Sequence, residues 1–112
     1  MTSLGFAYYY GSDARVSWVR RQPSVVSGET PCANAHTATG GVAIKAHYST
    51  IVPMTDSEHQ FLHQHGISSF TKKYGVTLDQ LRARAVEIEA AWVQVKDHFE
   101  AEFPESQEPV AP

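Results

Sequence analysis

Apolar side chains recur at spacings of three and four residues along one stretch of the chain, from Thr77 to Phe103. The members of this row are Leu78, Leu81, Ala85, Ile88, Trp92, Val95 and Phe99. Because an α-helix brings such positions onto one side, the spacing predicts a long amphipathic helix. Thr77 and Gln80 form a capping box at its start, and Pro104 ends it. A helix of this length would extend for roughly 40 Å, so we expect a partner to cover part of its apolar row.

The first half of the chain shows shorter apolar runs of another kind. Phe6–Tyr10 and Arg15–Gln22 are rich in aromatic or β-branched residues, and the turn-forming segment Gly11–Ala14 separates them. This arrangement predicts a hairpin. From Val42 to Val52 apolar and polar residues alternate, as in a half-buried strand, and Pro53 is expected to stop that strand. We therefore expect a small antiparallel sheet of about three strands in the N-terminal half.

Two short helices are predicted between this sheet and the long helix. The first starts at a cap formed by Asp56 or Ser57 and reaches about His65, because Gly66 then ends it. The second covers Ser68–Tyr74. The expected fold class is therefore α+β, with a helical C-terminal half dominated by one long amphipathic helix.

The domain expected from these elements covers residues 1–103, strand-rich over 1–53 and helical over 54–103, followed by a flexible tail at 104–112. The stretch 27–41 is rich in Gly, Ser, Thr and Ala and has no period. Such a segment is either disordered or a partner-binding loop. An alternative for the whole N-terminal half is that it is only partly structured.

Composition and charge narrow the class of protein. With 112 residues, 42% of them hydrophobic, the chain is long enough for one domain with a modest core. No apolar stretch approaches the ~20 residues of a membrane span and no secretory signal is present, so we expect a cytoplasmic protein. The net charge of −3 is uneven: residues 1–53 carry four Lys/Arg against two Asp/Glu, and residues 54–112 carry five against ten.

The segment Ile67–Val86 resembles a helix-turn-helix, with Phe70 and Tyr74 on the first helix, Gly75 at the turn and Leu81 on the second helix. The resemblance implies that the second helix enters the major groove of DNA. It would place Lys72 and Lys73 at phosphates, and Thr77, Gln80, Arg82 and Arg84 in the groove. An ordinary helix pair joined at a glycine cap explains the same pattern.

The chain contains six histidines and one cysteine, which raises the question of a metal site. His59 and His63 are four residues apart on a predicted helix, and Cys32 and His36 have the same spacing. Together they offer four zinc ligands if the 27–41 loop folds back onto the helix. Surface histidines explain the helical pair without any metal, so we expect none. The pair would still titrate near pH 6.

No arrangement of residues identifies an enzyme. The glycine pair at 40–41 lacks the context of a phosphate-binding loop, and the chain contains no recognisable nucleophile with its base. One further group of residues suits base stacking and phosphate pairing: Tyr8, Tyr9, Tyr10, Trp18, Arg15, Arg20 and Arg21. Sheet core and edge positions are the simpler interpretation of these residues.

The function predicted from these patterns is a small non-enzymatic adaptor or inhibitor without a cofactor. In this respect the chain resembles phage-encoded or regulatory inhibitors. It would bind a larger protein through Trp92, Val95, Phe99 and Phe103 together with the loop 27–41, and the long helix also suits a homodimer. The alternative is a DNA-binding transcriptional regulator that uses residues 67–86.

Overall fold

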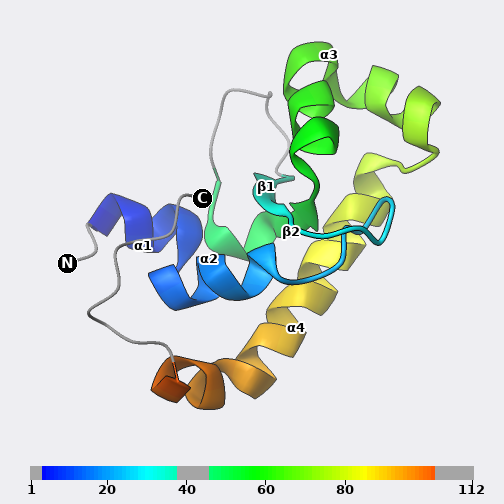
Figure 1. The fold of residues 1–112 in the computed structure, drawn as a ribbon. Coiled ribbons are helices and arrows are strands. Elements are labelled where there is room, and N and C mark those ends of the chain that lie inside the picture. The colour runs from blue at the N-terminus through cyan, green and yellow to red at the C-terminus, as the bar shows by residue number, and fades with distance from the viewer. Residues whose placement is uncertain (1–3, 38–45, 103–112) are drawn as a thin grey trace.

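The computed structural model describes residues 4–37 and 46–102 of the chain. Within these ranges the elements are α1 (Leu4–Tyr10), α2 (Asp13–Arg20), β1 (Ala33–His36), the 3-10 helix η1 (Tyr48–Thr50), β2 (Ile51–Met54), α3 (Asp56–Tyr74) and α4 (Leu78–Glu102). The predicted α+β class is confirmed, with two antiparallel strands instead of three. Figure 1 shows the strands at the centre of the molecule, with α1 and α2 on one side and the long α4 running past them.

The two strands pair along all four residues of each. Ala33 lies opposite Met54 and His36 lies opposite Ile51. Pro53 stands inside β2, which corrects the prediction that it stops a strand. Proline has no N–H to donate, but its carbonyl accepts a hydrogen bond from the backbone N–H of Val25 at 3.0 Å. The second edge of β2 is therefore bonded to a loop and not to a third strand.

Both apolar runs that were predicted as strands near the N-terminus are helices. Phe6–Tyr10 belongs to α1, and Arg15–Gln22 overlaps α2. Ser12 caps α2 by accepting a hydrogen bond from the backbone N–H of Arg15 at 3.1 Å. Every residue of α2 between its first and its last is buried. A helix buried all round has no polar stripe, so periodicity cannot distinguish its sequence from that of a buried strand.

The region between the N-terminal helices and α3 also differs from its prediction. The stretch 27–41, predicted to be either disordered or a partner-binding loop, contains β1. The predicted strand Val42–Val52 contributes only Ile51 and Val52 to β2, and η1 precedes them. Alanine and asparagine, which make up most of β1, are poor strand formers, so the sequence did not indicate a strand here. Residues 38–45 of both predicted segments lie outside the described residues.

A capping box starts α3 and also fixes a loop of the N-terminal half. The Thr55 hydroxyl accepts from the backbone N–H of Glu58 at 3.3 Å, and the Glu58 carboxylate accepts from the backbone N–H of Thr55 at 2.9 Å. The cap is thus Thr55, one residue before the predicted Asp56 or Ser57. The same carboxylate oxygen accepts from the Ser24 hydroxyl at 2.6 Å. Burial alone would raise the pKa of Glu58, but the hydrogen bonds that it accepts lower it overall.

Gly66 interrupts α3, as predicted. Its φ of 81° and ψ of 173° lie in a region that side chains with a Cβ rarely adopt, and the helix turns there. Gly75 ends α3 in the left-handed conformation, with φ 74° and its N–H donating to the Thr71 carbonyl at 2.8 Å. The two glycines therefore set the directions of the second part of α3 and of α4.

The predicted long helix is α4, and its apolar row faces the rest of the molecule. The Thr77–Gln80 capping box is confirmed by two reciprocal hydrogen bonds of 2.9 and 3.2 Å. Leu81, Ala85 and Trp92 are buried. With 25 residues the helix is about 37 Å long, close to the 41 Å of the longest extent of the molecule. The row expected to need a partner is largely covered by the chain itself, because α4 contacts α2, β2 and η1.

Two clusters of buried side chains form the core, and each joins residues from before and after Met54. The first packs α2 against α4 and contains Tyr10, Ala14, Val16, Trp18, Val19, Ile51 and Trp92. The second packs the strands against α3 and α4 and contains Ala35, Val52, Met54, Phe70, Leu81 and Ala85. The change of composition near Met54 is therefore not a boundary in the packing.

Among the helices described here, none combines the length and the apolar content that a bilayer crossing requires.

Candidate functional site

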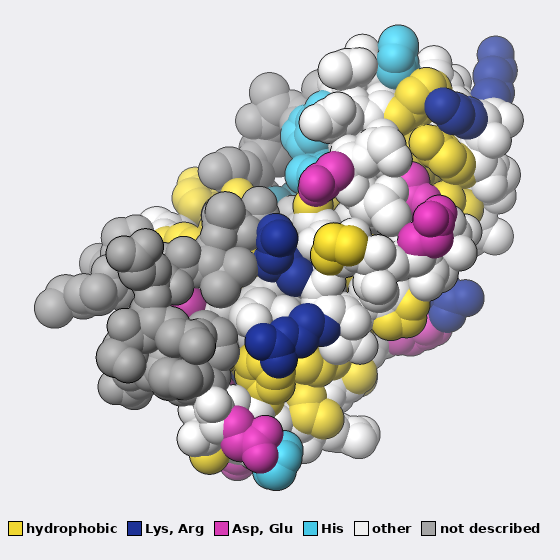
Figure 2. Space-filling model, viewed as in Figure 1, with side chains coloured by type: hydrophobic (Ala, Val, Ile, Leu, Met, Phe, Trp, Pro, Cys, Tyr) yellow, Lys and Arg dark blue, Asp and Glu magenta, His cyan; other side chains and the backbone are white. Residues whose placement is uncertain are grey.

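Two histidines on successive turns of α3 direct ring nitrogens at each other. The Nε2 atoms of His59 and His63 are 2.8 Å apart, and the ring centroids are 4.5 Å apart. The backbone N–H of His59 donates to the Thr55 carbonyl at 2.9 Å, so the capped first turn holds this residue in place. Figure 2 shows several histidine side chains on the face of the molecule where α3 lies. One rigid segment thus presents two imidazole nitrogens at one point.

A third histidine comes from the sheet. His36 is the last residue of β1, and its Nε2 lies 2.6 Å from the backbone oxygen of Tyr9 in α1. Because a carbonyl can only accept, Nε2 carries the proton of the neutral ring and Nδ1 is its acceptor nitrogen. The ring also meets Tyr10 edge-on, with centroids 5.1 Å apart. These contacts fix the imidazole against α1, while β1 itself contacts α3.

Electrostatic coupling connects the three histidines. Burial, followed by the charges of His63 and His36, lowers the pKa of His59 from 6.5 to about 4, against an opposing effect of Asp56. At neutral pH the His59 ring is therefore uncharged. A neutral imidazole is the form that binds a metal ion, so no proton has to be displaced from this ligand first.

The zinc ligand set considered from the sequence, Cys32, His36, His59 and His63, is not assembled. Cys32 is buried, and its thiol donates to the Glu29 carbonyl at 3.3 Å. Burial and nearby carboxylates raise the pKa of this thiol to about 11, which disfavours the thiolate that zinc needs. Within 4–37 and 46–102 no three His, Cys, Asp or Glu side chains form a group that could hold a metal ion. What the fold does bring together is the pair on α3, with His36 nearby.

The segment that resembles a helix-turn-helix comprises the end of α3, the Gly75 turn and the start of α4. Its predicted DNA-contacting residues are Lys72, Lys73, Thr77, Gln80, Arg82 and Arg84. Thr77 and Gln80 are engaged in capping α4. The Arg84 guanidinium lies 2.7 Å from the Glu87 carboxylate. The two lysines are exposed at the end of α3.

The partner surface predicted on α4 is not a continuous exposed surface. Trp92 is 3% exposed and stacks against Trp18, with ring centroids 5.4 Å apart, because α2 covers this part of the helix. This corrects the expectation that Trp92 meets a partner. Phe99 is half-buried, and the Arg21 guanidinium lies over its ring at 5.4 Å. Phe103 lies outside the described residues.

The exposed apolar side chains of α4 lie mostly at other positions. Val95 belongs to the predicted surface and is 38% exposed. Val86 and Val93 are 69% and 61% exposed, and the apolar row does not include either of them. They are two helical turns apart and share the outer face of α4.

Sequence patterns reveal only part of the histidine cluster. The spacing of His59 and His63 shows that they share a helix face. The contact of His36 with Tyr9 joins residues 27 positions apart, so no local sequence pattern predicts it. The run containing Tyr9 was also assigned to a strand, which would have placed its carbonyl elsewhere.

The fold is thus an α+β arrangement in which a two-stranded sheet leads into a histidine-bearing helix and a long helix packs against α2 and β2. The chain belongs to a family described as a protein of unknown function (DUF968), whose sequence profile matches residues 8–91. The match includes α2, both strands, α3 with its histidines and more than half of α4. Neither curated proteins nor solved structures gave a match.

Proposed function

We propose that this protein is a divalent-metal-dependent hydrolase of nucleic-acid phosphodiester bonds, with His59 and His63 as metal ligands. The 2.8 Å separation of their Nε2 atoms carries the proposal. Two imidazole nitrogens this close together could both be ligands of one divalent ion. In the structure a hydrogen bond joins the two rings, so an ion would bind only after the shared proton leaves and both lone pairs turn toward the ion.

Two protein ligands leave coordination positions for a water and a substrate oxygen, as a catalytic ion requires. An ion held by His59 and His63 would lower the pKa of a bound water, whose proton would pass to solvent. The water oxygen attacks phosphorus, the bond to the leaving ester oxygen breaks, and that oxygen takes a proton from solvent. Water and a diester thereby give a phosphomonoester and an alcohol.

The charge of His36 acts on His59, and the orientation of the His36 ring is fixed by the Tyr9 carbonyl. A residue in this position orients groups next to the ion without binding it. We therefore expect replacement of His36 to slow hydrolysis more than it weakens metal binding.

Exposed cations near the α3–α4 junction support a polyanionic substrate. Lys72 and Lys73 lie in the second part of α3, beyond the break at Gly66 from the ligand pair, and Arg82 and Arg84 are exposed at the start of α4. Contacts of such side chains with phosphates supply affinity that does not depend on sequence. In this proposal the residues of the segment that resembles a helix-turn-helix bind the phosphates of a nucleic-acid strand and do not contact its bases.

Metal binding is tested by titrating untagged protein with Co²⁺ in a calorimeter. We expect one ion per chain, and about a tenfold or greater loss of affinity in His59→Ala and in His63→Ala. His98→Ala is the matched control, because His98 is an exposed histidine on α4 that contacts only Glu102 among the described residues. Equal binding by the parent and the His59/His63 double variant refutes the site.

Hydrolysis is tested with plasmid DNA and a single-stranded oligonucleotide in the presence of Mn²⁺. Cleavage should disappear with EDTA and in His59→Ala. In His36→Ala it should slow while Co²⁺ binding persists. Metal binding without cleavage of either substrate rejects the hydrolase and leaves only the metal site.

A second candidate function is the protein-binding adaptor or inhibitor predicted from the sequence, now placed on a different surface. The exposed Val86 and Val93 on the outer face of α4 favour it. A double change of both valines to Glu should abolish self-association or capture of a larger protein, as measured by sedimentation. Unchanged sedimentation in the presence of the captured protein rules this surface out.

We also propose that the protein acts in the cytoplasm. The single cysteine is a buried free thiol, which suits a reducing compartment. Fractionation of the producing cells tests this location.

A further inference from the structure

The outer face of α4 carries an apolar row that does not belong to the core. Val86, Ala90 and Val93 follow one another at spacings of four and three residues, and Ala83 precedes Val86 by three. All four side chains are exposed. Because such spacings bring residues of successive helical turns side by side, the four residues form one strip along the helix, which we call the outer strip.

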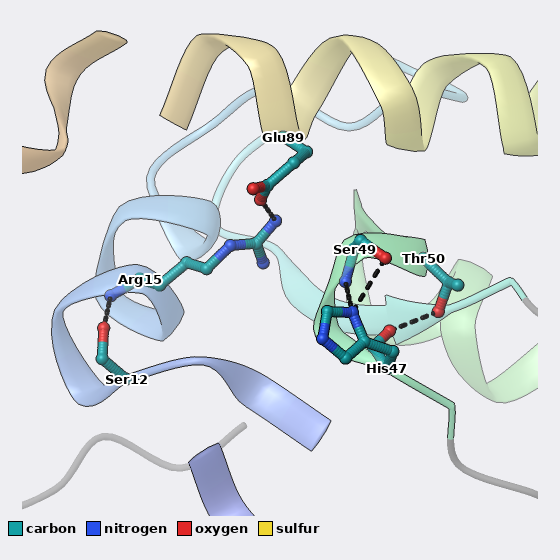
Figure 3. Close-up of polar contacts among 6 residues, drawn as sticks. All are labelled: Ser12, Arg15, His47, Ser49, Thr50 and Glu89. Atoms are coloured by element: carbon teal, nitrogen blue, oxygen red, sulfur yellow. Dashed lines mark hydrogen bonds and ion pairs between the residues drawn. The ribbon is translucent and has the colours of Figure 1, made fainter. Parts of the chain in front are cut away.

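Contacts on the opposite face of α4 hold the outer strip toward solvent. Figure 3 shows the Arg15 side chain reaching from α2 to the Glu89 carboxylate, where Nη2 lies 2.9 Å from Oε1. The Arg15 side chain is 1% exposed, so this ion pair is largely enclosed by the protein. On the same side of α4, Trp92 is buried against Trp18. A rotation of α4 that turned the outer strip inward would break both contacts, so the strip stays on the surface.

Opposite charges lie at the two ends of the outer strip. Arg82 comes four residues before Val86, and Asp97 comes four residues after Val93; both charged side chains are exposed. The Arg82 guanidinium lies 4.0 Å from the carboxylate of Asp79, which is itself 95% exposed. An exposed pair at this distance contributes little free energy, so Arg82 loses little when it exchanges Asp79 for a carboxylate of another molecule.

This order of charges matches the outer strip of a second copy of the chain in antiparallel orientation. When Val86 of one copy lies against Val93 of the other, Arg82 of each copy is level with Asp97 of the other, because each lies four residues further out. Twofold symmetry repeats the pair at both ends of the contact. A parallel arrangement would place like charges beside each other at both ends, which is unfavourable. The small side chains of Ala83 and Ala90 allow the two helices to approach closely.

We propose that the protein forms an antiparallel homodimer through the outer strip, with Val86 against Val93 and Arg82 against Asp97 of the second copy. The inference rests on the second candidate function, because it names the partner of the exposed valines as another copy of this chain. It does not depend on the hydrolase, since the outer strip belongs to α4 and the proposed metal ligands belong to α3.

Association is measured by sedimentation equilibrium of the full-length protein alone, up to about 500 µM, because one helix per copy makes a small interface. Arg82→Glu and Asp97→Arg each place like charges at both ends of the contact, so each should weaken dimerisation about 3- to 30-fold. The double variant restores opposite charges and should return to within about threefold of the parent. Arg84→Glu is the matched control, because Arg84 is exposed, pairs with Glu87 and lies outside the outer strip. Circular dichroism checks folding.

Orientation is tested by oxidising Val86→Cys and Val93→Cys, each alone and as a mixture. A disulfide needs Cα atoms within about 7 Å, whereas the two residues 86 of an antiparallel dimer are about 10 Å apart along the helix. We therefore expect cross-linked dimer mainly in the mixture. The natural Cys32 is buried and should not take part.

A parent that remains monomeric at every concentration overturns the inference. So does a double charge variant that stays as weak as the single ones, or a cross-link that Val86→Cys forms as readily alone as in the mixture. The Co²⁺ titration and the cleavage assay test the hydrolase separately. If the parent is monomeric but loses capture of a larger protein when both valines become Glu, the homodimer fails and the second candidate function stands. If the parent dimerises as described and captures nothing, the adaptor fails and the homodimer stands.

Discussion

At the scale of single residues, His59 makes folding sensitive to acid. Its pKa is about 4 in the folded protein, compared with 6.5 for an ordinary histidine. Between these two values the unfolded chain binds more protons than the folded protein, so stability must rise with pH across this window. We predict that the free energy of unfolding in urea is lower at pH 5 than at pH 7, and that His59→Gln flattens this dependence.

The acid sensitivity from His59 is separable from that of its neighbour Glu58. The pKa of Glu58 is lowered from its ordinary value of 4.5, so the stability that Glu58 contributes is present above that value and is lost as pH falls below it. A dependence between pH 5 and pH 7 that persists undiminished in His59→Gln would contradict our assignment.

At the scale of elements, two glycines with positive φ differ in what they tolerate. Gly66 has ψ near 173°, a conformation essentially reserved for glycine, while Gly75 has the ordinary left-handed values of a helix cap. No atom lies within 4 Å of a Cβ placed at either position, so the cost of a side chain is confined to the backbone.

We predict that Gly66→Ala lowers the free energy of unfolding by about 1–3 kcal/mol and that Gly75→Asn costs less, since Asn tolerates the left-handed region. Urea unfolding followed by circular dichroism measures both. Equal losses would show that the break in α3 relaxes when Gly66 is replaced.

At the scale of the whole molecule, the contact between Trp18 and Trp92 joins the N-terminal helices to α4. We predict that Trp92→Ala lowers the free energy of unfolding by about 3–5 kcal/mol, because it removes a large side chain from the first core cluster. The adjacent Val93→Ala should change it by about 0.5 kcal/mol or less, since Val93 is exposed. Similar effects of the two changes would mean that α2 does not cover α4 in solution.

The sequence predicted the features that depend on short-range interactions and missed those that depend on long-range packing. The long helix, its Thr77–Gln80 cap and the break at Gly66 depend on neighbours within a few positions, and their patterns identified them. The helix α2 is buried on all sides, so its sequence lacks the helical repeat of apolar and polar residues. Strand β1 is built from poor strand formers, so its sequence lacks the alternation of a strand. Of the histidine cluster, the pair on α3 was visible as a spacing, whereas His36 reaches it only through the packing of β1 against α3.

The Glu58 carboxylate couples the opening of the first turn of α3 to the opening of a loop in the N-terminal half. It completes the cap of α3 and also binds Ser24, 34 positions earlier, so helix initiation and loop closure share one hydrogen-bond acceptor. The amides of Val26 and Ser27, which donate to the same Ser24 hydroxyl oxygen, should therefore exchange with deuterium in step with that of Glu58. The start of the histidine-bearing helix would then open as one cooperative unit with a loop from the other half of the chain, and fraying of either segment would expose both.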